Sequence, residues 1–278
     1  MTIRLTILCE NTVARPFGLL GEHGFACYLE TPQGNYLFDT GQGQTLIPNA
    51  RALGKDLADI DALLISHGHY DHTGGLPQAL EARHGLNVYG HPDIFTARYW
   101  DIEGQRRYVG IPYQRKYLES LGARFCLHRE LIEVGPGVYL TGEIPRRTAF
   151  EKGDSQQFAV SSDGKILQPD PMVDDLSMVV ASPKGLILVL GCAHAGLVNI
   201  IQYVSEKFEG EKIYAVVGGT HLGFAGTEQF EETLKVLDDF NVEKVGVSHC
   251  TGLPKAAQLA SRLGERFFFG SVGTVLTI

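Results

Sequence analysis

Short apolar runs, each followed by a polar or glycine-rich stretch, alternate along the chain with amphipathic segments. This alternation is typical of a layered α/β protein. We expect strands over 2–9, 25–30, 36–38, 61–65, 87–91, 124–127, 131–134, 138–141, 178–180, 186–190, 213–217, 244–247 and 266–270, the last leading to 274–278. We expect helices over 46–57, 74–84, 113–121, 197–208, 228–240 and 254–264. The polar stretch 151–170 is expected to form a loop or lid.

The strand over 61–65 runs directly into the sequence His67-Gly68-His69-Tyr70-Asp71-His72. Residues two apart on a strand share a face, so His67 and His69 can point at the same spot. Asp71 or Thr73 can cap the helix expected to begin near Gly74. Imidazole and carboxylate groups suit Zn²⁺ and related ions, and the cluster has room for two. A solvated histidine-rich loop is the alternative, but ordered polar groups without a metal would be costly there.

Five of the expected strands end in a side chain that could bind metal or support such a site. Six of the ten histidines lie on or just after these ends, whereas His84 and His91 are expected to be structural or surface residues. If the strands share one sheet edge, a single pocket receives all of these groups. The candidates are Asp39, His67 with His69, Cys192 with His194, His221 and His249.

The His-x-His-x-Asp-His sequence resembles the signature of the metallo-β-lactamase superfamily, and Phe38-Asp39-Thr40-Gly41 resembles its first motif. The resemblance implies an α/β, metallo-β-lactamase-like four-layer αββα sandwich. It implies a single domain over 1–278 with an irregular, lid-like insertion at about 95–175. It also implies that Asp39 supports the metal site from behind the ligands.

The resemblance further implies how the ligands divide between two ions. His67, His69 and His194 would hold one ion, and Asp71, His72 and His249 the other. The cofactor would be Zn²⁺, one or two ions, with Mn²⁺ or Fe²⁺ as alternatives. Many members carry a bridging aspartate after a Gly, where this chain has Gly191-Cys192. Cys192 could ligate as a thiolate, or solvent alone could bridge, or one ion alone could be tightly held; His221 is expected to contact substrate or support the site rather than ligate.

Six motifs, among them the Phe38–Gly41 sequence, resemble a narrower branch, the family named for 7,8-dihydropterin-6-methyl-4-(β-D-ribofuranosyl)-aminobenzene-5′-phosphate synthase. The similarity runs from about residue 3 to residue 278. The motifs lie at 21–25, 38–41, 142–146, 191–201, 218–222 and 248–252.

The charge of the chain bears on its partners. A net charge of −8 argues against nonspecific nucleic-acid binding. Residues 98–147 nevertheless hold nine Lys/Arg against six Asp/Glu, which could suit a small anionic substrate. Five scattered cysteines suggest reduced thiols, and neither a signal peptide nor an apolar run of bilayer length is apparent. We therefore expect a cytoplasmic protein without membrane partners; a homodimer is compatible with the sequence.

These observations leave two possible functions. The first is a metal-dependent hydrolase or related transferase, in which metal-activated water attacks a small anionic substrate such as a phosphoester or a pterin-like compound. Asp71 would be both ligand and proton acceptor, and Arg146, Glu143 and His23 would bind the substrate. The second is a protein of the same fold that binds metal and ligand without turnover.

Overall fold

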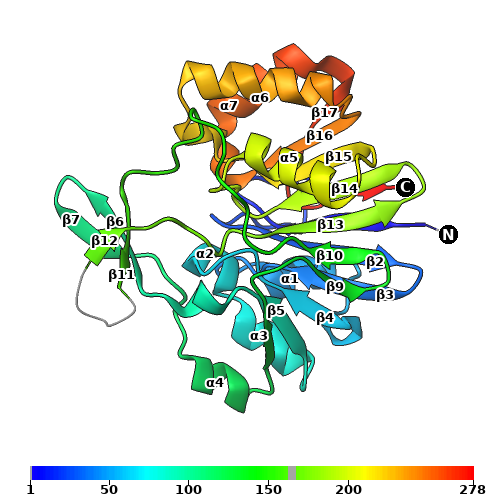
Figure 1. Cartoon of the computed structure of the whole chain (residues 1–278). Helices are drawn as coiled ribbons and strands as arrows, with labels where there is room; N and C mark the ends of the chain where they lie inside the picture. Colours follow the sequence, from blue (N-terminus) through cyan, green and yellow to red (C-terminus); the bar gives the residue numbers. More distant parts are fainter. Residues whose placement is uncertain (1, 162–166) are drawn as a thin grey trace.

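The computed structural model describes residues 2–161 and 167–278. Two seven-stranded sheets pack face to face, and helices cover the outer face of each sheet (Figure 1). The four-layer αββα arrangement expected from the sequence is therefore confirmed. No helix within the described residues has the length and apolar character needed to cross a bilayer.

The first sheet has the strand order β18-β1-β2-β3-β4-β5-β8. The pairs from β3 to β8 are parallel, and those from β18 to β3 are antiparallel. Parallel neighbours end at the same edge, so the residues after β3 and β4 emerge side by side. Its strands are β1 (Arg4–Cys9), β2 (Ala26–Thr31), β3 (Gly34–Phe38), β4 (Ala62–Leu64), β5 (Asn87–Gly90), β8 (Arg124–Leu127) and β18 (Val275–Thr277).

The second sheet has the strand order β17-β16-β15-β14-β13-β10-β9, with parallel pairing from β14 to β17. The central strands read as continuous apolar runs because both of their faces are covered. Its strands are β9 (Ile132–Gly135), β10 (Val138–Leu140), β13 (Ser177–Ser182), β14 (Gly185–Leu190), β15 (Ile213–Gly219), β16 (Lys244–Ser248) and β17 (Phe267–Phe269).

The helices pack on the two outer faces and leave three apolar layers in the core. One lies between the sheets, one between the first sheet and α1, α3 and α4, and one between the second sheet and α5, α6 and α7. The helices are α1 (Leu46–Ala52), α2 (Tyr70–Thr73), α3 (Leu76–Ala82), α4 (Arg115–Ser120), α5 (Leu197–Lys207), α6 (Thr227–Asp239) and α7 (Leu253–Leu263). Short 3₁₀ turns are η1 (Leu57–Asp59), η2 (Pro92–Phe95), η3 (Leu222–Phe224), η4 (His249–Thr251) and η5 (Gly264–Arg266).

A third, four-stranded sheet lies on the side of the sandwich where α2 begins (Figure 1). Of the expected loop or lid over 151–170, the loop is wrong for the described part, since β11 and β12 fall within it, and the lid stays a prediction; residues 162–166 lie outside the described residues. β11 pairs with β6, far away in sequence, which local periodicity could not reveal. The strands are β6 (Arg98–Ile102), β7 (Gln105–Tyr108), β11 (Gln157–Val160) and β12 (Leu167–Pro169).

The expected helix cap near the histidine motif is also wrong. The chain turns at once into the four-residue helix α2, with His69 at its N-cap, and α3 begins separately after Gly75. The carboxylate of Asp71 lies within 3.1 Å of His23 and 3.3 Å of His249 instead of capping a helix. A motif rich in ligands thus forms a compact turn between strand and helix.

Candidate metal centre

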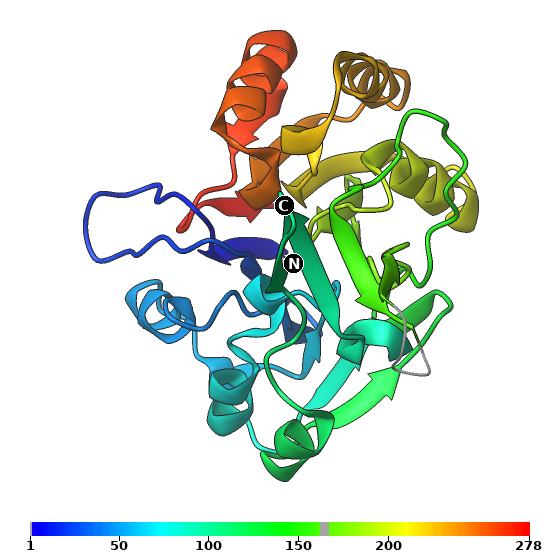
Figure 2. The same cartoon turned by 90° about the vertical axis from the view of Figure 1, so that its left-hand side faces the viewer.

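The strand ends that carry the candidate side chains meet on one side of the sandwich. They do not share one sheet edge, the condition considered from the sequence, because β3 and β4 belong to the first sheet and β14, β15 and β16 to the second. Figure 2 looks onto this side, with the helices of the two outer layers at the top and bottom of the view. Both sheets therefore contribute to one cavity, as layered α/β folds do at strand ends.

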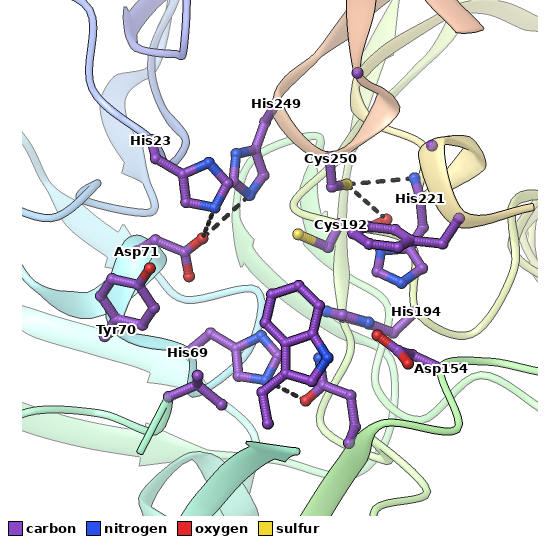
Figure 3. A pocket seen from close by; sticks show the side chains of 16 residues that line it. His23, His69, Tyr70, Asp71, Asp154, Cys192, His194, His221, His249 and Cys250 are labelled. Carbon is purple, nitrogen blue, oxygen red and sulfur yellow. Dashed lines mark hydrogen bonds and ion pairs between the residues drawn. The ribbon is translucent and has the colours of Figure 1, made fainter. Parts of the chain in front are cut away.

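The cavity has a volume of about 300 Å³. Its inner part is formed by His69, Asp71, Cys192, His194 and His249, which point toward one another (Figure 3). The rim adds apolar and aromatic side chains, of which Tyr70, Trp100, Val109 and Phe224 are the largest.

Four of the five strand ends share an unusual backbone conformation. Asp39, Ala193, His221 and His249 have φ between 51° and 58°, the left-handed region that non-glycine residues rarely adopt. Each such residue costs on the order of 1 kcal/mol, and such residues gather at functional sites. The strain turns the chain sharply after each strand and aims side chains into the cavity.

A chain of hydrogen bonds fixes the ring tautomer of His67. The Ser66 hydroxyl donates to the Asp39 carboxylate at 2.7 Å, so its oxygen accepts from Nδ1–H of His67 at 2.8 Å. His72 also donates its Nδ1–H to Asp39, at 2.7 Å. In both rings Nε2 is therefore the nitrogen left for a ligand.

The neighbouring imidazoles are oriented by side-chain amides. Nε2–H of His69 donates to Oε1 of Gln157 at 3.1 Å, which leaves Nδ1 of His69 as an acceptor. Oδ1 of Asn11 accepts from the backbone N–H of Gly24, so it also accepts from Nδ1–H of His249, at 3.2 Å. Nε2, the other nitrogen of His249, lies 3.3 Å from the Asp71 carboxylate.

The nitrogens left for a ligand face one another. Nε2 of His67 lies 3.0 Å from Nδ1 of His69, and Nε2 of His72 lies 3.3 Å from Nε2 of His249. Two nitrogens bound tetrahedrally at about 2.1 Å from one Zn²⁺ would be on the order of 3.4 Å apart. The facing nitrogens of His67 and His69 are both acceptors with no proton between them, so they repel each other, and a cation bound by both removes that repulsion. The donor set therefore fits a metal centre.

Cys192 lies between the two sets of ligands. Within the described residues, it belongs to two groups whose possible ligand atoms all lie within 4.8 Å of one another, one with His67 and His194 and one with His72 and His249. Its Sγ is 3.2 Å from Nε2 of His72. The thiol thus lies next to both groups of histidines.

Burial controls the protonation of the cluster. It lowers the pKa of His67 and His194 well below the usual range and that of His69 to about 3, so these rings are neutral. Burial also opposes charge on His72, but the Asp39 carboxylate outweighs this and raises its pKa to about 9. Burial alone would raise the pKa of Asp71, yet hydrogen bonds from His23 and His249 hold it well below its ordinary value.

His194 and His221 carry the unpaired polar atoms of the site. All four of their ring nitrogens are buried without a hydrogen-bond partner, and the two rings lie 4.3 Å apart. Unpaired buried nitrogens are costly unless something absent from the protein chain satisfies them. His221 belongs to none of the ligand groups formed by the described residues, so its expected supporting or substrate-contacting role stays a prediction.

The structure brings one of the three expected substrate-binding residues to the cavity. His23 lies at the rim and forms a 3.1 Å ion pair with Asp71. The guanidinium of Arg146 instead donates to the backbone oxygens of His194 and Pro171, both at 2.7 Å. Glu143 points away and accepts from His91. Neither Arg146 nor Glu143 lines the cavity, and their expected contact with substrate stays a prediction.

Sequence reasoning missed residues that hold the site together. The sequence around Gln157 gave no signal, since its role arises from the pairing of β11 with β6. Arg98 is 1% exposed and binds Asp170 and Asp174, and Asp174 accepts from the backbone N–H of Gly68. Gly68 cannot carry a side chain, because a Cβ there would lie 2.1 Å from the oxygen of Ile94.

Comparisons with known proteins agree on one family. The sequence profile of the metallo-beta-lactamase superfamily matches residues 21–242. The 7,8-dihydropterin-6-methyl-4-(beta-D-ribofuranosyl)-aminobenzene-5′-phosphate synthase of Methanocaldococcus jannaschii is 30% identical, covering 95% of this chain and 93% of its own. A second, uncharacterized M. jannaschii protein is 30% identical, covering 99% of this chain and 100% of its own. The crystal structure of a metal-dependent hydrolase of the beta-lactamase superfamily matches with a TM-score of 0.85 and 29% identity. The match covers 99% of this chain and 98% of that protein.

Proposed function

The chain belongs to the metallo-β-lactamase superfamily, and from this premise we propose that it is a metal-dependent hydrolase or related transferase acting on a small anionic substrate. One observation supports this best: the buried, neutral rings of His67 and His69 turn facing lone pairs toward each other, 3.0 Å apart, and His69 lines the cavity together with Asp71. The synthase name of the M. jannaschii relative favours keeping group transfer beside hydrolysis.

In this proposal His67, His69 and His194 hold one ion, Asp71, His72 and His249 hold a second, and Cys192 lies between them. Imidazole and thiolate ligands favour Zn²⁺, with Mn²⁺ and Fe²⁺ as alternatives. Such ions, when bound, lower the pKa of water and polarise a phosphoryl or carbonyl oxygen.

The residues of the chain have separate tasks. Asp39 keeps Nε2 of His67 and Nε2 of His72 directed into the site through the hydrogen bonds described above. Asp71, only 6% exposed, accepts the proton of the attacking water. His23, whose pKa is raised by its hydrogen bond to Asp71, lies 55% exposed at the rim and passes that proton to solvent.

The charge of the cavity limits where an anionic group can bind. No Lys or Arg stands among the described residues that line it, while Asp71 and Asp154 do. An anionic group of the substrate would therefore be held at the ions rather than by a guanidinium, and the remainder of the substrate would lie toward the aromatic rim.

The test compares variants that remove ligands with a matched histidine variant. We expect His67→Ala and Asp71→Ala to lose bound metal and hydrolysis of bis(p-nitrophenyl) phosphate together, whereas His84→Ala, whose ring lies outside the cavity, keeps both. Metal is measured by elemental analysis after reconstitution with Zn²⁺ or Mn²⁺. Full turnover in either ligand variant would refute the proposal.

A wider substrate screen separates the proposal from its alternative. Reconstituted protein would be assayed against phosphodiesters, lactones and pterin phosphates. A compound that binds in a metal-dependent way but is never converted would favour the alternative hypothesis, a protein that holds metal and ligand without turnover.

A further inference from the structure

Two aromatic side chains from separate parts of the fold meet at the mouth of the cavity. Trp100 comes from β6 in the third sheet and Phe224 from η3, which follows β15 of the second sheet. Their ring centroids are 6.1 Å apart, with the planes at 76° to each other. Both line the cavity that contains the proposed metal ligands.

This aromatic pair is not part of the core. The side chain of Phe224 is 56% exposed, and neither ring belongs to any of the three apolar clusters formed by the described residues. The indole N–H of Trp100 is held by Oε1 of Gln156 at 3.0 Å, so the ring is oriented rather than loose. Oriented aromatic surface that faces a cavity instead of the core is suited to binding.

The inner wall continues this flat surface toward the ligands. The imidazole of His221 lies 4.7 Å from the ring of Phe224, with only 30° between their planes. His221 in turn lies 4.3 Å from the ring of His194. The rings thus form a continuous path from the mouth to the proposed metal site, which Figure 3 shows at His221 and His194.

We propose that Trp100 and Phe224 form a subsite for a flat aromatic or heteroaromatic ring, whose attached anionic group reaches the proposed metal site. The proposal rests on the proposed function, because it assumes that ions hold the anionic group. It adds that the substrate is an aryl or heteroaryl compound rather than an aliphatic one. Stacking of a ring on aromatic side chains is typically worth about tenfold or more in affinity.

A comparison of two phosphate esters of similar size separates the contribution of the ring to affinity from that of the anionic group. Phenyl phosphate and cyclohexyl phosphate carry the same anionic group, so their contacts with the ions cancel in the comparison. Affinities for metal-reconstituted protein would be measured by calorimetry. We expect phenyl phosphate to bind about tenfold more tightly. Trp100 is the one tryptophan of the chain, so its emission reports whether the ring reaches the subsite.

Variants test which side chains create the preference. We expect Phe224→Leu and Trp100→Leu to reduce the preference for phenyl phosphate to about twofold or less while metal content stays unchanged. Tyr117→Leu is the matched control, since this aromatic residue is 46% exposed on α4 and does not line the cavity; it should keep the preference.

The outcomes separate the two proposals. Equal affinity for both esters, undetectable binding of both, or a preference that survives in both cavity variants would overturn the ring subsite. Hydrolysis of bis(p-nitrophenyl) phosphate is measured on the same preparations. A ring preference without any turnover would support the subsite and count against the hydrolase. Turnover without a ring preference would support the hydrolase and count against the subsite.

Discussion

The buried ion cluster around Arg98 connects the third sheet to the histidine motif. Arg98 lies in β6, and its guanidinium donates to Asp170 and Asp174, each at 2.7 Å. The other oxygen of Asp174 accepts from the backbone N–H of Gly68, between His67 and His69. We expect Arg98→Met to destabilise the protein and to weaken metal binding, because it removes the cation between two buried carboxylates.

The size of the expected loss of stability follows from the burial of Arg98 and its two partners. All three side chains are 3% exposed or less, so the change leaves two carboxylates in a poorly solvated place. Removing one partner of such a buried pair typically costs about 3–5 kcal/mol. Total stabilities are on the order of 5–15 kcal/mol, so the loss would be a large fraction of the whole. The loss should shrink in acid, because burial raises the pKa of Asp174 and favours its neutral form there.

Equilibrium unfolding in urea measures the effect, with Arg106→Met as the matched control. Arg106 pairs with Asp101 on the next strand of the same sheet, but its side chain is 57% exposed, and such exposed pairs contribute about 1 kcal/mol or less. If Arg98→Met lost no more stability than Arg106→Met, the reasoning about the buried cluster would be refuted.

Three further changes test other parts of the site. Cys192→Ala should lower the number of ions bound per chain, measured by elemental analysis, while Cys250→Ala should not; equal loss in both would contradict a bridging role. Gln157→Leu, which frees the ring of His69, should weaken metal affinity by about 10–100-fold in a chelator competition, whereas Gln156→Leu should not. Burial raises the pKa of Glu151 above its ordinary 4.5, so the folded state binds the proton more tightly. The unfolding free energy of the wild type should therefore fall relative to Glu151→Gln as pH rises through 4.5 and above, and a constant difference in urea unfolding would contradict this.

Much of the sandwich could be predicted from local patterns. Continuous apolar runs marked β14 and β15, and the spacing of Leu197, Ile200 and Val204 marked α5, because burial imposes its period directly on the sequence. The His-x-His-x-Asp-His motif was informative because few packing roles require so many potential metal ligands so close together.

The remainder depends on contacts between distant segments. β11 pairs with β6, and neither strand alternates strongly enough to be recognised alone. Arg146 lies in a motif typical of the family branch, but its partners are backbone oxygens, which leave no trace in a sequence. The left-handed conformation of Ala193 is likewise imposed by the strands around it, since alanine has no preference for that region.

The central claim is that side chains from both sheets hold a metal ion through imidazole and sulfur. Zinc K-edge X-ray absorption of the protein reconstituted with Zn²⁺ tests it most directly. We expect several imidazole nitrogens at about 2.0–2.1 Å and a sulfur at about 2.3 Å. A spectrum with oxygen ligands alone, as for an ion loosely held at the surface, would contradict the claim.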